Sequence, residues 1–300
     1  MKYRFIPFFC LSLVMLTCGS SIPSFDKNKA YDYIVKQCEF GPRIPNSDAH
    51  HQCRDFLYNK LKEYAEVTRL QPFTFYDQAR DDTLYLDNII ASFNVDKSNR
   101  ILLGAHWDCR PWADKDPDSS KHTEPVMGAN DAASGVAVLL TLAEIFKKQP
   151  PPMGVDVVFF DGEDYGDYEI NDNWLLGSKY FAANLGKYRP RYVVVIDMIG
   201  DADLDIHKDL NSNTYCGRLV NKIWQAASLA EAKHFYPDVK HSVYDDHIPF
   251  IEARIQAAVI IDLDYEWWHT INDKPEKCSA ESLDEVGRTL IRLLYDKQLQ

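Results

Sequence analysis

The sequence has no stretch in which lysine and arginine cluster. Its 300 residues include 33 lysines and arginines against 45 aspartates and glutamates, which gives a formal net charge of −12 at pH 7. Proteins that bind nucleic acid need grouped cationic side chains to neutralise phosphates, so the composition argues against a nucleic-acid partner. The acidity itself says little about a substrate and is typical of a soluble surface that repels its own copies.

Linkers, internal repeats and low-complexity tracts are also absent from the sequence. Hydrophobic residues make up 46% of the chain, which is enough to bury a large core. We therefore expect a single domain that covers residues 22–300.

The sequence contains no Cys-x-x-Cys pair, which argues against a structural zinc knuckle. Five cysteines lie outside the N-terminal segment: Cys38, Cys53, Cys109, Cys216 and Cys278. An exported chain can form disulfides, and Cys38 with Cys53 is one possible pair because the two flank a proline-containing turn. The pairing stays open at this point, but an odd number leaves at least one thiol free.

The hydrophobic run near the N-terminus is too short for a comfortable membrane span. It covers residues 5–16, follows Lys2 and Arg4, and leads into Cys18 with a glycine and a serine after it. This arrangement is typical of a signal segment and resembles a bacterial lipoprotein cleavage site. We expect residues 1–18 to be a signal or lipoprotein segment, with Cys18 as a possible lipid anchor to the membrane. Plain secretion and an uncleaved anchor are the alternatives. The protein is thus expected to be exported by a bacterium, as a periplasmic or outer-membrane-associated lipoprotein.

The spacing of apolar residues changes along the chain. Residues 26–39 and 47–65 show the one-sided periodicity of helices, and residues 67–76 and 84–94 alternate like two antiparallel strands. Further strands are predicted at residues 101–103, 156–160, 192–196 and 256–263, and further helices at residues 136–148, 174–185, 217–233 and 282–295. Long loops are expected at residues 110–127, 164–173 and 204–213. All-apolar strands are buried on both faces, so the sequence predicts an α/β protein, a three-layer α/β/α sandwich around a mixed, mostly parallel sheet.

Five segments place metal-binding residue types at or near the ends of hydrophobic runs. They are residues 104–108, 128–135, 159–164, 195–200 and 267–270. Carboxylates at the ends of apolar strands are costly unless a partner offsets their charge. Zinc takes histidine nitrogen and carboxylate oxygen, with three protein ligands and one open position in catalytic sites. Parallel sheets bind ligands beyond the carboxyl ends of their strands, where several of these segments fall. The pattern therefore predicts a zinc enzyme.

Two of these segments carry paired polar residues. His106 and Asp108 point to the same side of an extended chain, so we expect them to ligate a metal or to support a ligand. A hydrogen-bonded structural histidine is the alternative. Glu163 and Asp164 are adjacent carboxylates that would repel each other without a cation, and a solvated acidic loop is the alternative. Because successive side chains diverge, one of the two can ligate while the other acts as a base.

Four single residues complete the set of candidates. Asp131 has small neighbours that allow close approach to a metal, and helix capping is its alternative role. Asp197 ends an aliphatic strand, where a buried aspartate bonded to loop amides is the alternative. Asp245 precedes a proline-containing helix that it could instead cap. His269 alone would be a weak candidate, but it is interpreted as a ligand because the chain also carries the other candidate ligands.

The order of these motifs resembles the zinc aminopeptidase-like fold and, within it, the glutaminyl-peptide cyclotransferases, or glutaminyl cyclases. The resemblance covers nearly all of the chain after the N-terminal segment. Its more specific motifs are Asp161-Gly162-Glu163-Asp164, Leu176-Gly177-Ser178-Lys179, Asp245-Asp246-His247-Ile248-Pro249-Phe250 and Trp268-His269-Thr270. Residues 106–114 are similar to bacterial members of the animal-type cyclases.

This resemblance implies a zinc-dependent catalytic domain that holds one zinc ion. The implied ligands are Asp131, Asp164 and His269. The implied catalytic residues are Glu163, as general acid and base, and its hydrogen-bonding partners Asp197 and Asp245. The implied walls of the substrate pocket are Trp268 and Trp174. Animal members usually carry glutamate at the position of Asp164, but the shorter side chain still offers a carboxylate oxygen.

The implied reaction converts N-terminal glutaminyl residues of peptides and proteins to pyroglutamate with release of ammonia. The alternative is a dinuclear zinc aminopeptidase, in which two metals would share the bridging Asp131 and be held by His106, Asp131, Asp164, Asp197 and His269. A non-catalytic surface lipoprotein is a third hypothesis, which the complete set of candidate residues disfavours. Peptide and protein N-termini are the expected partners, and a monomer is expected.

Overall fold

A computed structural model describes residues 22–167 and 173–299 of the chain. The signal or lipoprotein segment expected at residues 1–18 lies outside the described residues. In the two described ranges, no helix combines the length and the apolar character that a membrane crossing requires.

Within the described residues, six strands form the central sheet, in the spatial order β1-β2-β4-β3-β5-β8. Their bounds are β1 Val67–Asp77, β2 Asp82–Phe93, β3 Arg100–His106, β4 Gly154–Phe160, β5 Tyr192–Asp197 and β8 Ala257–Ile261. β1, β2 and β4 pair in antiparallel fashion, whereas β4, β3, β5 and β8 run parallel to one another. The predicted mixed, mostly parallel sheet is therefore confirmed.

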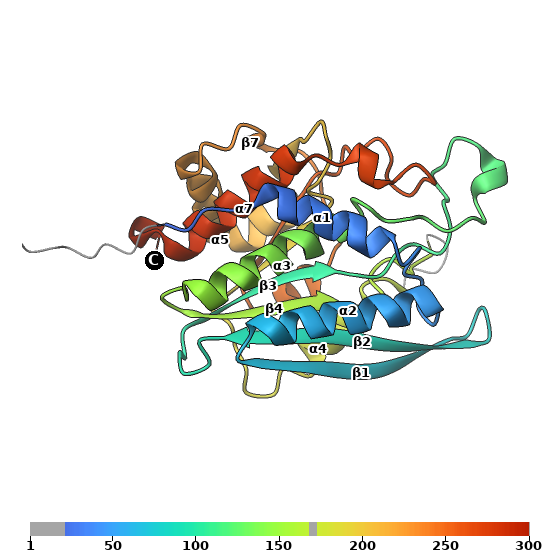
Figure 1. Ribbon diagram of the computed structural model, residues 1–300, viewed down its shortest axis with the longest axis horizontal. Helices are drawn as coiled ribbons and strands as arrows, with labels where there is room; N and C mark the ends of the chain where they lie inside the picture. The colour runs from blue at the N-terminus through green and yellow to red at the C-terminus, as the bar shows by residue number, and fades with distance from the viewer. Residues whose placement is uncertain (1–21, 168–172, 300) are drawn as a thin grey trace, which may run out of the picture.

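Helices cover both faces of this sheet, which gives the three predicted layers (Figure 1). On one face lie α1 Lys27–Cys38, α2 Asp48–Tyr64, α3 Ala133–Lys148, α5 Leu210–Leu229 and α7 Ala280–Tyr295; on the other lie α4 Leu176–Ala183 and α6 Ile248–Glu252. Alternate residues along a strand serve the two cores: Leu103 packs with the first set, while Leu102 packs with Phe181 of α4 and Phe250 of α6. α3 contacts β3 as well as α1, α2 and α7, which explains why most of its residues are buried.

The prediction that residues 204–213 form a long loop is wrong in part. This segment contains β6 Ile206–Lys208, which pairs in parallel with β7 Phe235–Val239, and the start of α5. α5 begins at Leu210 because the Asp209 side chain accepts a hydrogen bond of 2.6 Å from the Ser212 amide. Helical geometry is interrupted at Cys216, just before the start that apolar spacing predicted.

The five cysteines of the described chain are free, so the disulfide considered between Cys38 and Cys53 does not form. The turn between them directs the Arg43 side chain inward, where it is fully buried and donates to the carbonyl oxygens of Trp107, Met127 and Gly128. Burial raises the pKa of the Cys38 thiol to about 11 and that of the Cys53 thiol to about 12. Neither thiol is therefore an efficient nucleophile at neutral pH.

Candidate active site and metal centre

Strand order brings the candidate residues together. β3 lies between β4 and β5, and the parallel strands end at one edge of the sheet. His106 and Asp197 are the last residues of β3 and β5, and Glu163 and Asp164 follow the end of β4 after two residues. The loop after β8 carries His269, whose φ of 54° lies in the left-handed region that recurs at functional sites.

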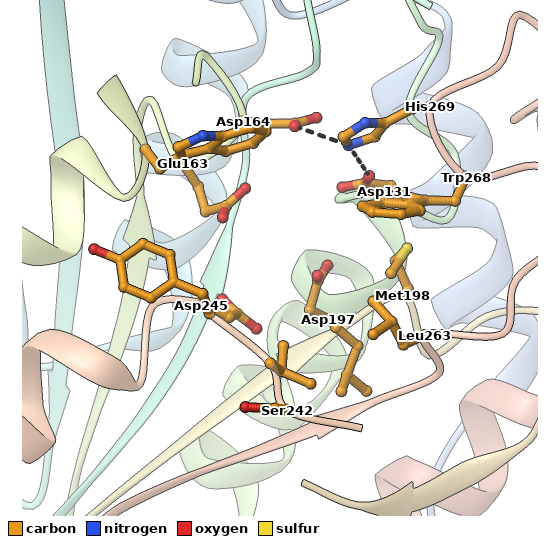
Figure 2. A pocket seen from close by; sticks show the side chains of 14 residues that line it. Asp131, Glu163, Asp164, Asp197, Met198, Ser242, Asp245, Leu263, Trp268 and His269 are labelled. Carbon is orange, nitrogen blue, oxygen red and sulfur yellow. Dashed lines mark ion pairs between the residues drawn. The ribbon is translucent and has the colours of Figure 1, made fainter. Parts of the chain in front are cut away.

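One group of possible metal ligands consists of Asp131, Asp164 and His269. All three are buried, and one ligand atom from each lies within 4.8 Å of the others. The His269 Nε2 atom is 3.1 Å from Asp164 Oδ1 and 3.7 Å from Asp131 Oδ2 (Figure 2). Tetrahedral zinc with bonds of about 2.0 Å requires ligand atoms roughly 3.3 Å apart, so this donor set fits zinc. Among the described residues, the buried Asp164 Oδ2 atom also has no hydrogen-bond partner, as expected of an oxygen that faces a cation.

A second group shares Asp131 with the first. The His106 Nε2 atom lies 3.0 Å from Asp131 Oδ1 and 3.2 Å from Asp197 Oδ1, and all three residues are buried. These two groups are the only ones in residues 22–167 and 173–299 with the spacing of a metal site. The inventory that the sequence identified for one or two metals is therefore assembled, with Asp131 between the two positions.

Glu163 lies next to both groups but belongs to neither. Its side chain faces the pocket (Figure 2), and its Oε2 atom is 4.0 Å from His106 Nδ1. Burial raises the pKa of this carboxyl well above its usual range, and the charges of Asp164, Asp246 and Asp245 add to the effect, while His106 opposes it. A raised pKa is the direction of change that a carboxyl needs if it is to act as both general acid and general base.

Asp197 and Asp245 complete the acidic side of the pocket. Burial raises the pKa of both, and the charge of Asp197 helps to bring that of Asp245 to about 7. The alternative roles considered for them are wrong. Within the described chain no loop amide donates to Asp197, which pairs with His106 instead. α6 has no side-chain cap, and the Asp245 side chain accepts from the Asp246 amide.

Asp131 does not cap a helix either. Residue 132 occupies the N-cap of α3 and no side chain caps that helix. The backbone around Asp131 is held by Asp273, whose carboxylate accepts from the Asn130 amide at 2.8 Å and the Asp131 amide at 3.1 Å. Sequence reasoning missed Asp273, because an aspartate in a polar turn looks like a surface residue until the fold buries it.

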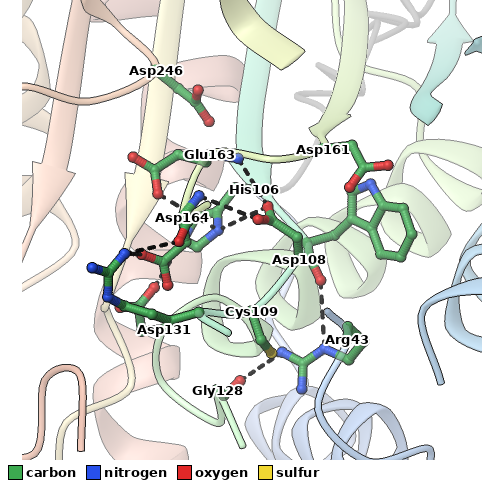
Figure 3. Close-up of polar contacts among 12 residues, drawn as sticks. Arg43, His106, Asp108, Cys109, Gly128, Asp131, Asp161, Glu163, Asp164 and Asp246 are labelled. Carbon is green, nitrogen blue, oxygen red and sulfur yellow. Dashed lines mark hydrogen bonds and ion pairs between the residues drawn. The ribbon is translucent and has the colours of Figure 1, made fainter. Parts of the chain in front are cut away.

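Asp108 positions other residues of the site. Its carboxylate accepts from the Glu163 amide at 3.1 Å and the Asp164 amide at 3.2 Å, and it lies 3.4 Å from His106 Nδ1 (Figure 3). Asp108 is fully buried and belongs to neither metal group, although its carboxylate contacts a member of each, His106 and Asp164. Of the two roles that the sequence left open for His106 and Asp108, the geometry allows ligation only for His106.

The pocket beside these residues has a volume of about 660 Å³. Its lining combines carboxylates with apolar side chains, among them Met198, Val243 and Leu263. Both predicted walls are present. The Trp174 ring is nearly parallel to the His269 ring, with 6.4 Å between the two ring centres. The centre of the Trp268 ring lies 4.4 Å from the centre of the His269 ring. A pocket of this kind suits a small, largely uncharged group held between indoles.

Comparisons with known proteins agree with this geometry. The sequence profile of peptidase family M28 matches residues 88–294. The chain is 27% identical to aminopeptidase YwaD of Bacillus subtilis over 68% of its length, and it spans only 42% of that relative. A crystal structure of a Zn-dependent exopeptidase from Parabacteroides distasonis is 36% identical, with a TM-score of 0.88 over 92% of this chain and 100% of that one. The crystal structure of Bacteroides thetaiotaomicron glutaminyl cyclase bound to N-acetylhistamine is 34% identical, with the same TM-score and coverage.

Proposed function

The chain belongs to peptidase family M28, and within this family we propose that it is a zinc-dependent glutaminyl-peptide cyclotransferase. Its substrates would be peptides and proteins that begin with glutamine, and its products pyroglutamyl peptides and ammonia. The observation that carries the proposal is the pocket itself. A candidate acid and base, Glu163, lines the same pocket as a three-ligand metal group, two indoles and several aliphatic side chains. Likeness to a solved glutaminyl cyclase along most of the chain supports it.

The residues that would hold zinc are Asp131, Asp164 and His269. Zinc, when bound there, supplies a Lewis acid for the side-chain amide oxygen of the substrate. Two carboxylates and one neutral imidazole would balance the formal charge of a zinc ion, and the fourth position would stay open for the oxygen on which negative charge develops.

Glu163 carries the proton transfers in this proposal. The substrate's α-amine attacks its own side-chain carbonyl carbon, so a carbon–nitrogen bond forms within the substrate and no water is needed. Glu163 takes a proton from the attacking nitrogen and gives it to the departing amide nitrogen, which leaves as ammonia. One group can serve both steps only if its pKa lies near neutrality, and the burial of Glu163 raises its pKa in that direction.

Asp197 and Asp245 would keep that carboxyl in place. Three acids packed around one small space cannot all be charged, so they share protons. The raised pKa of Asp245, about 7, means that this side chain is partly protonated at neutral pH and can donate a hydrogen bond. Trp268 and Trp174 would hold the substrate head so that its amine faces its own amide, which is where most of the rate gain of an intramolecular reaction arises.

A dinuclear aminopeptidase is the second candidate function, and one observation favours it. His106, Asp131 and Asp197 form a complete second group of possible ligands. Two metals with a bridging Asp131 would suit activation of water for peptide hydrolysis. In the cyclotransferase proposal this second group holds no metal, and His106 pairs with Asp131 and Asp197 instead.

One assay separates these functions. The protein is incubated with glutamine β-naphthylamide, and the products are identified by mass spectrometry and an ammonia determination. Cyclised amide together with ammonia supports the cyclotransferase. Free naphthylamine without cyclised product would overturn it in favour of the aminopeptidase. The zinc content per chain, one or two, is measured on the same sample and should be one.

We also propose that the protein is an exported monomer, with residues 1–18 as its signal segment, Cys18 as a possible lipid anchor and residues 22–300 as one domain. The bacterial glutaminyl cyclase to which it is similar over 92% of its length supports only the last of these. Metabolic labelling with a fatty acid, compared between the wild type and Cys18→Ala, tests the anchor. Light scattering of the domain tests the monomer.

A further inference from the structure

The Arg110 guanidinium lies in the interior beside the metal groups and is fully buried. Its Nε and Nη2 atoms donate to the two carboxylate oxygens of Asp114, at 2.8 Å and 2.7 Å. Its Nη1 atom donates to the carbonyl oxygens of Asp164 at 3.0 Å and Gly166 at 2.9 Å, and it lies 3.4 Å from Asp164 Oδ1. This one side chain thus reaches both the backbone and the carboxylate of a proposed zinc ligand.

Asp114 extends the contact to a second proposed ligand. Its Oδ1 atom lies 3.3 Å from the Nδ1 atom of His269. A carboxylate at one ring nitrogen holds the histidine in the tautomer that presents the other nitrogen to a metal. Here that other atom, Nε2, is the one that faces Asp164 at 3.1 Å.

The guanidinium also touches an aromatic wall of the pocket. Its central carbon lies 4.8 Å from the centre of the Trp174 ring and 5.5 Å from the centre of the Trp112 ring. Trp174 lines the pocket and is stacked parallel to His269. Arg110 therefore contacts the backbone of one ligand, the carboxylate that orients another, and the tryptophan beside them.

We propose that Arg110 is a positioning residue that holds Asp164, His269 and Trp174 in the geometry that binds zinc. The inference rests on the proposed function in so far as it takes zinc at Asp131, Asp164 and His269. It adds that this part of the site is organised by a buried cation. A buried charge needs close partners, and the fork of the guanidinium supplies donors in three directions at once. A lysine ammonium has the charge without the fork, so charge and geometry can be separated by substitution.

The test compares zinc affinity, measured by competition with a chromophoric chelator, among purified full-length variants. Residues that orient metal ligands typically contribute 10- to 100-fold to metal affinity, so Arg110→Lys should weaken zinc binding by about that factor. Arg80→Lys is the matched control. Arg80 stacks on the same Trp112 ring at 4.4 Å and pairs with Asp77, but it contacts no proposed ligand. The zinc affinity of the Arg80→Lys variant should equal that of the wild type.

Asp114→Asn provides a second, nearly isosteric variant in case Arg110→Lys does not fold. It should also weaken zinc binding, while circular dichroism of the zinc-free protein stays native. Arg110→Ala with millimolar guanidinium should regain part of the lost affinity, because the free ion can occupy the vacated site. A merely structural role would lower the melting temperature of the zinc-free protein and leave zinc affinity unchanged.

Zinc affinity within twofold of the wild type in folded Arg110→Lys, or in folded Asp114→Asn if the first does not fold, overturns the inference. None of these measurements uses cyclisation as its readout. If the wild type binds zinc and the variants lose it while no pyroglutamate is formed, the proposed function fails and the inference stands. If the wild type itself binds no zinc, both fail.

Discussion

Replacement of Glu163 by glutamine removes the one group to which the proposed mechanism gives proton transfer, and changes little else. The two side chains have nearly the same size and shape. Glu163 belongs to neither group of possible metal ligands, and the hydrogen bond from its amide to Asp108 is made by the backbone. We therefore expect the Glu163→Gln variant to fold, to bind zinc as the wild type does, and to lose turnover.

The size of the loss follows from the number of steps that depend on this carboxyl. A positioned general acid or base contributes about 10²–10⁴-fold to a rate, and Glu163 would act in both bond formation and bond cleavage. A loss of at least about 10³-fold in kcat is expected, which corresponds to about 4 kcal/mol in the activation free energy. KM should change little, because the indole and aliphatic walls of the pocket are untouched.

The assay follows pyroglutamate formation from a glutaminyl peptide, with zinc content determined on the same preparation. Glu266→Gln is the control for the loss of one acidic charge, because this exposed residue follows β8 near the pocket without lining it. It should retain full activity. If zinc-loaded Glu163→Gln turned over within tenfold of the wild type, Glu163 would not be the base and the mechanism would have to be abandoned.

Three further predictions follow from the same geometry. Asp164→Ala and His269→Ala should each purify with far less zinc than the wild type, because a three-ligand site loses a third of its donors; wild-type zinc content in either would contradict the assignment. Removal of zinc with a chelator should lower the melting temperature, since an ion present at a thousand times its Kd stabilises the folded state by about 4 kcal/mol. Added zinc should restore the melting temperature. An unchanged melting temperature after zinc removal would argue against a structured metal site. Burial raises the pKa of Asp262 to about 7, so the folded state binds a proton more tightly than the unfolded state and loses stability as pH rises from about 4 to 7. Asp262→Asn should therefore lose less stability than the wild type between pH 5 and pH 8 in urea titrations, by on the order of a few kcal/mol, and parallel pH curves would refute the raised pKa.

The alternation of apolar strands and helices was sufficient to predict the layers of this protein. Strands such as β3 and β4 are buried on both faces, so their sequences are apolar throughout and lead to one architecture. Element ends were predicted less well. The start of α5 is set by the Asp209 cap, and α4 begins after Leu175, which adopts a left-handed conformation that no apolar pattern encodes.

Many residues of the candidate site could be predicted from the sequence for a related reason. A carboxylate or histidine at the end of a buried strand needs a partner, so residues such as His106, Asp164 and Asp197 are conspicuous in the sequence. Asp273 and Arg43 are not conspicuous, because they come from turns that only the folded chain buries. Both bind backbone groups more than 60 residues away, and a contact with a distant backbone group cannot be predicted from residue types.

The sequence by itself determined the kinds of ligand available, the layers that present them and the bulk of the pocket walls, because these depend on residue type and local periodicity. Only the tertiary structure decided which carboxylates face a common point and which ones instead hold the ligand residues in place through hydrogen bonds. The order β4-β3-β5 places three strand ends side by side, and the burial of Arg110 joins Asp164 to Asp114. Both are long-range arrangements, set by how the whole chain packs and not by any segment of it.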